Sequence, residues 1–374
     1  MSLPDVVVAG GGAIGLSVAW HLAKAGAGVT VFDSGPDNGQ ASIASAGMLA
    51  PLAEAEEHGP LVSLGLESLS LYPAFSAALK EDAGIDAFPI GPGTLRVALD
   101  EAEEKSLGMC FSWQRSKGLP LEWLTGAEAR RLEPALSRLA RAAVFSPEEK
   151  RVAPRALMSA LAWACRRRGV RLEAGRVTGF ETRGARVTAA KTDGASVPCG
   201  QAVIAAGAWS AGLAKNLGVD IPVFPVRGQM ISFLRPEPDA RHAIYSRTGY
   251  VVPREEGRLA AGATQERAGF DCGTTKEAVD ELSAAARGLI PSLAGAHVES
   301  AWAGLRPGSG DGLPILGPLP GWENAHVASG HFRNGILLTP VTGRIMARLV
   351  LERRIEDRFK PFLAQRWGPL AKTA

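Results

Sequence analysis

The chain has 374 residues, of which 46% are hydrophobic and 21% are charged, and its formal net charge is +3 at pH 7. This length favours two domains with substantial hydrophobic cores. The nearly balanced charge argues against a nucleic-acid-binding protein. Short basic clusters at residues 166–168 and 353–354 fall at the ends of helical patterns, where cations stabilise the helix dipole.

The cysteines and the apolar segments indicate in which cellular compartment the protein is expected. Neither CxxC nor HExxH spacing occurs, so the sequence predicts no zinc site and no disulfide framework, and it favours a reduced, cytoplasmic protein. The apolar stretch at residues 6–22 has no basic region before it and is interrupted by glycines, unlike a signal peptide. No other segment is long enough to span a bilayer, although peripheral membrane association stays open. The four cysteines are Cys110, Cys165, Cys199 and Cys272.

The amino terminus has the pattern of a dinucleotide-binding unit. In DVVVAGGGAIG, a β-branched run leads into GxGxxG, then a helical pattern and a second strand that ends in Asp33. Gly10 allows the tight turn, Gly12 lets a pyrophosphate approach the backbone, and Gly15 brings the helix against the sheet. The helix N-terminus would bind the diphosphate and Asp33 a ribose hydroxyl. The pattern fits NAD or FAD, whereas an acid at this position disfavours NADP.

Further elements follow in chain order. Thr125 and Glu128 form a capping-box pattern before a short helix. Residues 158–165 have helical spacing, Gly169 ends that helix, and the sequence TDGAS predicts a hairpin. AVIAAGAWS, at residues 202–210, predicts another parallel strand of the first sheet, with its C-terminal end toward the cofactor. An ordinary core strand explains this spacing equally well.

After Pro222 the sequence becomes rich in short, turn-separated strands, which favours an antiparallel sheet. We therefore expect an α/β fold, α+β overall, with a Rossmann-like nucleotide domain and a second, mainly antiparallel β domain that binds substrate. The nucleotide domain would be discontinuous, formed by residues 1–78, 146–219 and 318–374. The substrate domain would comprise residues 79–145 and 220–317.

The stretch WAGLRPGSGDGLPILG contains one arginine, Arg306, and one aspartate, Asp311, in an otherwise apolar and glycine-rich segment. A buried guanidinium is costly unless an anion meets it. Asp311 would be that anion in a structural pair. Otherwise the partner is a ligand.

This stretch, together with GRLAAGATQERAGFD, GHFRNGILLTP and AGMLAP, carries a family resemblance. Over nearly its full length the chain resembles the D-amino-acid-oxidase-like FAD-dependent oxidoreductases, and most closely the glycine oxidases of thiamine biosynthesis. The resemblance implies a D-amino-acid-oxidase or glutathione-reductase-like fold and noncovalent FAD. It also implies a small amino acid and O₂ as partners, with neither nucleic acid nor stable membrane insertion, and it leaves a homo-oligomer open.

The resemblance also assigns substrate-side residues. Arg306 matches the arginine that holds the substrate carboxylate, and a guanidinium fork suits two carboxylate oxygens. Tyr250 would support the same carboxylate, Arg333 lies at a second substrate-side position, and Met48 lies near the flavin. For Tyr250 and Met48, core packing is the alternative. Thr248 and Gln265 stand where some glycine oxidases have His and Met, which suggests altered room around the substrate amine, unless both side chains point away.

The implied cofactor contacts form four groups along the chain. They are Gly10, Gly12, Ala13, Ile14, Gly15 and Asp33; Ser45, Ala46, Gly47 and Met48; Val177, Ala206, Gly207 and Trp209; and Gly330, His331, Phe332, Arg333, Asn334, Gly335 and Ile336.

The motifs offer no histidine or carboxylate as an acid–base catalyst, and His21 and His331 are not placed as one. The family chemistry needs none, because hydride passes from Cα to flavin N5, the imine is hydrolysed to glyoxylate plus amine, and O₂ becomes H₂O₂. Residues 334–336 would begin the last helix, with amides that stabilise the reduced flavin. The alternatives are a D-amino-acid dehydrogenase that passes electrons to a quinone and, more distantly, a non-catalytic dinucleotide-binding sensor.

Overall fold

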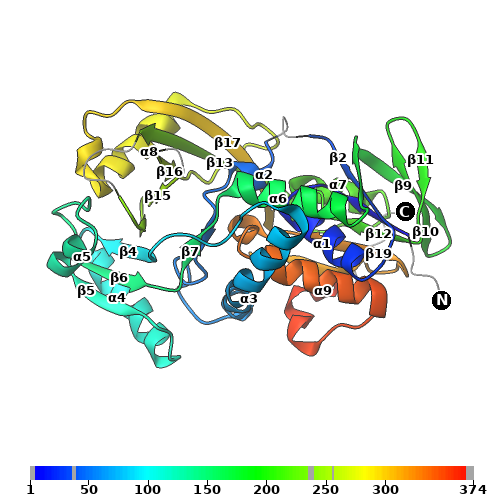
Figure 1. Cartoon of the computed structure of the whole chain (residues 1–374), viewed down its shortest axis with the longest axis horizontal. Coiled ribbons are helices and arrows are strands. Elements are labelled where there is room, and N and C mark those ends of the chain that lie inside the picture. The colour runs from blue at the N-terminus through cyan, green and yellow to red at the C-terminus, as the bar shows by residue number, and fades with distance from the viewer. Residues whose placement is uncertain (1–4, 36–38, 235–239, 255–256, 368–374) are drawn as a thin grey trace.

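The computed structural model describes residues 5–35, 39–234, 240–254 and 257–367. Two large sheets dominate it (Figure 1): one carries the N-terminal strand and its helices, at the right of the view, and the other lies toward the left. The predicted combination of a Rossmann-like domain and a second β-rich domain is confirmed. No helix in these ranges is long and apolar enough to cross a membrane.

The first sheet is parallel except at one edge. Its strand order is β18-β19-β12-β1-β2-β8, and only β18 pairs antiparallel with its neighbour. The prediction of a parallel strand near residue 202 is confirmed, because β12 pairs with β1. The strands are β1 (Val6–Ala9), β2 (Val29–Asp33), β8 (Arg171–Ala174), β12 (Gln201–Ile204), β18 (Ile315–Pro318) and β19 (Ala325–Ser329).

Both faces of this sheet are covered, as its continuous apolar strands require. Side chains of β1 alternate between two cores: Val6 and Val8 pack with the long helices, while Val7 and Ala9 pack toward a small antiparallel sheet. The helices are α1 (Ala13–Lys24), α3 (Pro60–Ala83), α6 (Pro154–Arg167) and α9 (Thr339–Glu352). The second face carries β9 (Val177–Arg183), β10 (Arg186–Thr192), β11 (Ser196–Pro198) and α7 (Ser210–Lys215). The hairpin predicted at TDGAS joins β10 to β11.

The second sheet has eight strands in the order β17-β13-β16-β15-β14-β4-β6-β5. All neighbours are antiparallel except β14 and β4. The strands are β4 (Thr94–Ala98), β5 (Glu122–Thr125), β6 (Ala142–Ser146), β13 (Val223–Leu234), β14 (Ala243–Ser246), β15 (Gly249–Pro253), β16 (Arg258–Gly262) and β17 (Val298–Ser309). Its helices are α4 (Glu101–Ser116), α5 (Gly126–Leu132), which has the predicted capping box, and α8 (Lys276–Leu289).

The remaining elements are short. They are α2 (Ala41–Ala44), the paired β3 (Met48–Leu49) and β7 (Lys150–Arg151), and the 3₁₀ turns Gly207–Trp209, Pro291–Leu293, Phe332–Asn334, Asp357–Phe362 and Ala364–Trp367.

Three of the domain boundaries expected from the sequence fall inside elements, and the one at 145/146 cuts Ser146 from the end of β6. The boundary at 78/79 cuts α3, which continues to Ala83, and the boundary at 317/318 cuts β18. Both elements pack with the first sheet, α3 against α6 and α9, and β18 against β19. The whole of α3 and the whole of β18 therefore pack with the first sheet.

Candidate functional site

A cavity of about 560 Å³ extends from the glycine-rich turn after β1 to the facing strands β13 and β17. It is lined by every predicted cofactor residue except Gly15 and Gly330. The lining ones are Gly10, Gly12, Ala13, Ile14, Asp33, Ser45, Ala46, Gly47, Met48, Val177, Ala206, Gly207, Trp209, His331, Phe332, Arg333, Asn334, Gly335 and Ile336. The sequence segments that were predicted to bind one cofactor thus line one cavity.

The glycine turn at one end is possible only without side chains. Gly10 has φ 110°, and a Cβ built there would lie 2.3 Å from the carbonyl oxygen of Ala205. A Cβ on Gly15 would lie 1.9 Å from the Gly10 oxygen, so Gly15 serves helix–sheet packing and not the cavity wall. The turn leads directly into α1, where Ser42 accepts a hydrogen bond from the Ala13 N–H at 3.0 Å. A helix N-terminus that opens on a cavity is suited to a diphosphate.

Asp33 lies at the C-terminal end of β2 and borders the same end of the cavity. Its Oδ2 accepts a hydrogen bond from the Gly11 N–H at 2.6 Å, and its Oδ1 accepts from the Gly35 N–H at 2.9 Å and from Gln40 Nε2 at 2.8 Å. The carboxylate is therefore held in place. Together with the side-chain-free turn, it makes this end fit the ADP half of FAD.

Arg306 lies at the other end of the cavity, on β17, and reaches across β13. A Cβ on Gly228 of β13 would lie 2.1 Å from Arg306 Nη1, so the guanidinium occupies space that only glycine leaves free. Nη1 donates to the Thr264 carbonyl at 2.9 Å. Burial lowers the pKa of Arg306, an effect that nearby Tyr250 and Glu54 only partly offset.

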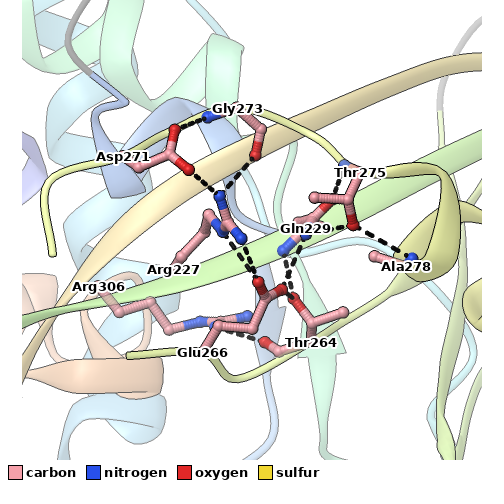
Figure 2. A network of polar contacts seen from close by, with 9 residues as sticks. All are labelled: Arg227, Gln229, Thr264, Glu266, Asp271, Gly273, Thr275, Ala278 and Arg306. Carbon is pink, nitrogen blue, oxygen red and sulfur yellow. Dashed lines mark hydrogen bonds and ion pairs between the residues drawn. The ribbon is translucent and has the colours of Figure 1, made fainter. Parts of the chain in front are cut away.

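The carbonyl that receives Arg306 belongs to a tightly bonded loop (Figure 2). Thr264 Oγ1 accepts from the Gln229 N–H at 2.9 Å and donates to Glu266 Oε1 at 2.5 Å. Glu266 Oε2 pairs with Arg227, which also contacts Asp271. Glu266 thus forms its ion pair with Arg227, and the acceptor that this loop offers to Arg306 is the carbonyl oxygen of Thr264.

The alternative of an internal pair between Arg306 and Asp311 is wrong. Asp311 Oδ2 accepts from Arg366 Nε at 2.7 Å, and its Oδ1 accepts from Arg366 Nη2 at 3.0 Å. Within the ranges that the structure describes, no carboxylate lies at ion-pair distance from Arg306. The cation therefore faces the cavity without an internal counter-ion.

Tyr250 and Met48 combine the two roles that the sequence left open. Tyr250 of β15 is buried in a small apolar cluster, with its hydroxyl 3.7 Å from Met230 Sδ, and it also lines the cavity. Met48 packs against the same cluster and lines the cavity too. Tyr250 and Met48 therefore both pack in the apolar cluster and border the cavity.

Arg333 borders the Arg306 end of the cavity and forms an ion pair with Glu54. Glu54 Oε1 also accepts a hydrogen bond from the Tyr245 hydroxyl at 2.7 Å. No sequence motif marks Glu54, which lies six residues after Met48 and just beyond the AGMLAP block. Gln40, Ser42 and Met230 also line the cavity but stand in no motif.

Three expectations need correction. Thr248 is exposed in the β14–β15 turn and Gln265 is exposed beside Glu266, and neither lines the cavity. The chain reverses sharply at Thr248, which turns its side chain toward Ser246 Oγ at 3.1 Å. Residues 334–336 form a turn, with 3₁₀ geometry up to Asn334, and α9 begins only at Thr339.

The two histidines of the sequence analysis are not poised for acid–base work. Burial lowers the pKa of His331 to about 3, and its Nε2 lies 3.1 Å from Thr342 Oγ1. Burial likewise lowers the pKa of His21 to about 4, and its Nδ1 lies 2.8 Å from the Ser17 carbonyl oxygen. Both rings are neutral at pH 7, and His21 does not line the cavity.

Comparison with known proteins agrees with this geometry. The family model "FAD dependent oxidoreductase" (DAO) matches residues 5–349. A glycine oxidase of Geobacillus kaustophilus is 36% identical to this chain over 362 residues, which cover 96% of each protein. The crystal structure of glycine oxidase from that organism aligns with a TM-score of 0.92 at 34% identity, over 98% of this chain and 99% of the other. An iminodiacetate oxidase from Chelativorans sp. BNC1 aligns with TM-score 0.87 at 25% identity, over 96% and 98% of the two chains. The chain therefore belongs to the DAO family of FAD-dependent oxidoreductases.

Proposed function

We propose that this protein is an oxidase of glycine or of small N-substituted glycines. The observation that carries the proposal is Arg306, a cation at the far end of the cavity that has no ion-pair partner among the described residues. A substrate carboxylate would supply the missing anion, because the planar guanidinium can donate to both of its oxygens. The glycine oxidase of Geobacillus kaustophilus supports the same substrate class.

In this proposal, the residues of the protein bind FAD and the substrate and orient one against the other. The glycine turn and Asp33 would hold the ADP part of FAD, and the segment from Phe332 to Ile336 would border the part near the substrate. When bound, FAD accepts the two electrons and the α-hydrogen that the substrate loses. Arg306 and Tyr250 would fix the carboxylate and so determine which side of the substrate faces the cofactor. For glycine, the overall balance is glycine, O₂ and water giving glyoxylate, ammonia and H₂O₂.

Acid–base catalysis by histidine is not part of the proposal. His331 lines the cavity, but burial lowers its pKa and keeps the ring neutral. Catalysis would rest on positioning and on the exclusion of water by the buried wall around Tyr250 and Met230. Because these side chains are large, bulky groups on the substrate Cα should be disfavoured.

A substrate comparison tests the proposal. FAD-loaded protein should consume O₂ and produce H₂O₂ in equal amounts with glycine, sarcosine and N-ethylglycine. Glycine and the N-alkyl glycines should all be oxidised, D-alanine should be weaker, and D-phenylalanine weakest. A clear preference for D-phenylalanine, or amino-acid oxidation with a quinone but without peroxide, would contradict it.

The cellular setting belongs to the same proposal. A cytoplasmic location is supported by four cysteines that form no disulfide in the described ranges. Fractionation of cells should find the activity in the supernatant after membranes are pelleted. Chromatography by size, coupled to light scattering, would measure whether the protein is a monomer or a homo-oligomer.

A further inference from the structure

The charged groups around the cavity are few and divide between its two ends. Asp33 and Arg176 belong to the ADP end, near the ends of β2 and β8. The other charged lining residues are Glu54, Arg306 and Arg333. Among the described lining residues, Glu54 is therefore the one acid at the substrate end.

Glu54 is held at this end by two partners. Its Oε1 is in an ion pair with Arg333 Nη2 and accepts a hydrogen bond from the Tyr245 hydroxyl at 2.7 Å. The Arg333 side chain is 12% exposed and that of Glu54 is 36% exposed, so the pair lies where the cavity meets the surface. Glu54 is thus a fixed part of the wall.

The same groups act on Arg306. The guanidinium of Arg333 lies 6.0 Å from the ring of Tyr250, the phenol that neighbours Arg306. Burial disfavours the Arg333 cation, but Glu54 together with Tyr245 and Tyr250 more than offsets this, and the pKa of Arg333 is raised. Since Glu54 neutralises Arg333, Arg306 carries the one uncompensated positive charge among the described lining residues of the substrate end.

We propose that Glu54 makes the site selective for amines that carry a single carboxylate. This inference rests on the proposed function, since it assumes that Arg306 binds the carboxylate of a glycine. A second carboxylate on the N-substituent would have to displace Glu54 from Arg333 or lie beside it as a like charge. Removal of the Glu54 charge frees Arg333 as a second carboxylate-binding group.

Sarcosine and iminodiacetate form a matched substrate pair, because they differ by one carboxylate on the N-methyl group. In FAD-loaded wild type, kcat/KM for iminodiacetate should be roughly a hundredfold below that for sarcosine, as expected for an uncompensated like-charge contact. Glu54→Gln should raise the ratio of iminodiacetate to sarcosine by at least about tenfold. Glu57→Gln removes the same charge from an exposed residue outside the cavity lining, and should leave the ratio unchanged.

Binding of unreactive ligands gives a second readout that does not depend on turnover. Methoxyacetate and diglycolate are the ether analogues of the two substrates and have no amine to oxidise. Calorimetry on FAD-loaded wild type should show tighter binding of methoxyacetate, and Glu54→Gln should reduce or reverse this order. If Glu54→Gln does not fold with FAD, the relative affinity of wild type for methoxyacetate and diglycolate tests the proposal by itself.

The outcomes separate the two proposals. If glycine and sarcosine are oxidised but wild type accepts iminodiacetate as well as sarcosine, the role of Glu54 is refuted and the proposed function stands. Equal binding of the two ether ligands, or an identical shift with Glu57→Gln, would also refute it. If neither glycine nor sarcosine is oxidised, the proposed function fails on its own.

Discussion

At the scale of single residues, the substrate end depends on one cation and on one missing side chain. Arg306 donates to the Thr264 carbonyl and has no ion-pair partner in the described ranges. Its guanidinium lies over Gly228, where a side chain would collide with it. Arg306 pairs with Val226 and Gly228 pairs with Gly304, so the two positions are diagonal neighbours on β13 and β17, and this strand pair builds both the cation and the space for it.

Replacement of the cation tests its role. Arg306→Ala should retain FAD, whereas kcat/KM for glycine or sarcosine should fall at least about thirtyfold, since truncation of one partner of a buried charge pair costs about 2–5 kcal/mol. Arg306→Lys should recover only part of the loss, because an ammonium cannot donate to both carboxylate oxygens in one plane. Steady-state kinetics and flavin content measure both effects. Near-normal kinetics with reduced thermal stability would instead show a structural arginine.

The glycine beside the Arg306 guanidinium, Gly228, gives an independent test. Gly228→Ala should raise KM while FAD stays bound, because a Cβ 2.1 Å from Nη1 must displace the guanidinium. Gly288→Ala is the matched control, since a Cβ there meets open space on α8. Kinetics of the two variants beside wild type decide: equal KM values would show that the guanidinium is not fixed by β13.

At the scale of elements, the loop after β3 connects the core to the cavity. Glu149 Oε1 accepts from the Leu52 N–H at 2.7 Å, and Arg96 Nη1 donates to the Leu52 carbonyl at 3.1 Å. This clamp holds the segment that presents Ala53 and Glu54 to the cavity. Burial raises the pKa of Glu149 to about 7, so its protonated form is favoured in the folded state.

This raised pKa predicts a pH dependence of stability. Because Glu149 binds its proton more tightly when folded, its stabilising contribution is full below its ordinary pKa of 4.5 and is lost as pH rises through about 7. Between these values, the free energy of unfolding of wild type should fall by up to about 3 kcal/mol relative to Glu149→Gln. Urea unfolding at several pH values measures the difference. Parallel pH profiles for wild type and Glu149→Gln would contradict it, and exposed Glu148→Gln is the control.

Elements with local signals could be predicted, and those fixed by packing could not. The turn at Gly10, the strand near residue 202 and the capping box at Thr125 all follow from short patterns, and all are confirmed. The start of α9 at Thr339 could not be read from the sequence, because Asn334 and Gly335 resemble a helix start but belong to a separate turn. Which way Thr248 and Gln265 point depends on turns that the sequence does not specify.

At the scale of the whole molecule, the cavity collects residues from segments far apart in the chain. Its ADP end comes from β1, β2 and the turn after β12, and its substrate end from β13, β15 and β17 of the second sheet (Figure 1). Motifs could locate the ADP end because each glycine has a local reason. Motifs could not show which acid pairs with which arginine, because these pairs join residues far apart in the chain. Asp311 pairs with Arg366, and Glu54 pairs with Arg333.

Asp33 links the cofactor to the first sheet. Asp33→Ala should weaken FAD binding by roughly tenfold or more, since hydrogen bonds to a charged group contribute about 1.5–3 kcal/mol. The variant should purify partly without FAD, and excess FAD should restore much of the turnover, because Asp33 is remote from Arg306. Flavin release on dilution measures this, and unchanged occupancy would remove Asp33 from the cofactor site.

The most direct test of the proposed function is the reduction of bound FAD by substrate in the absence of oxygen. Mixed anaerobically with sarcosine or glycine, the FAD-loaded protein should lose the visible absorbance of the oxidised flavin, and air should restore it with one H₂O₂ per flavin. Arg306→Ala should be reduced far more slowly at the same substrate concentration. A flavin that stays oxidised with both substrates would contradict the account.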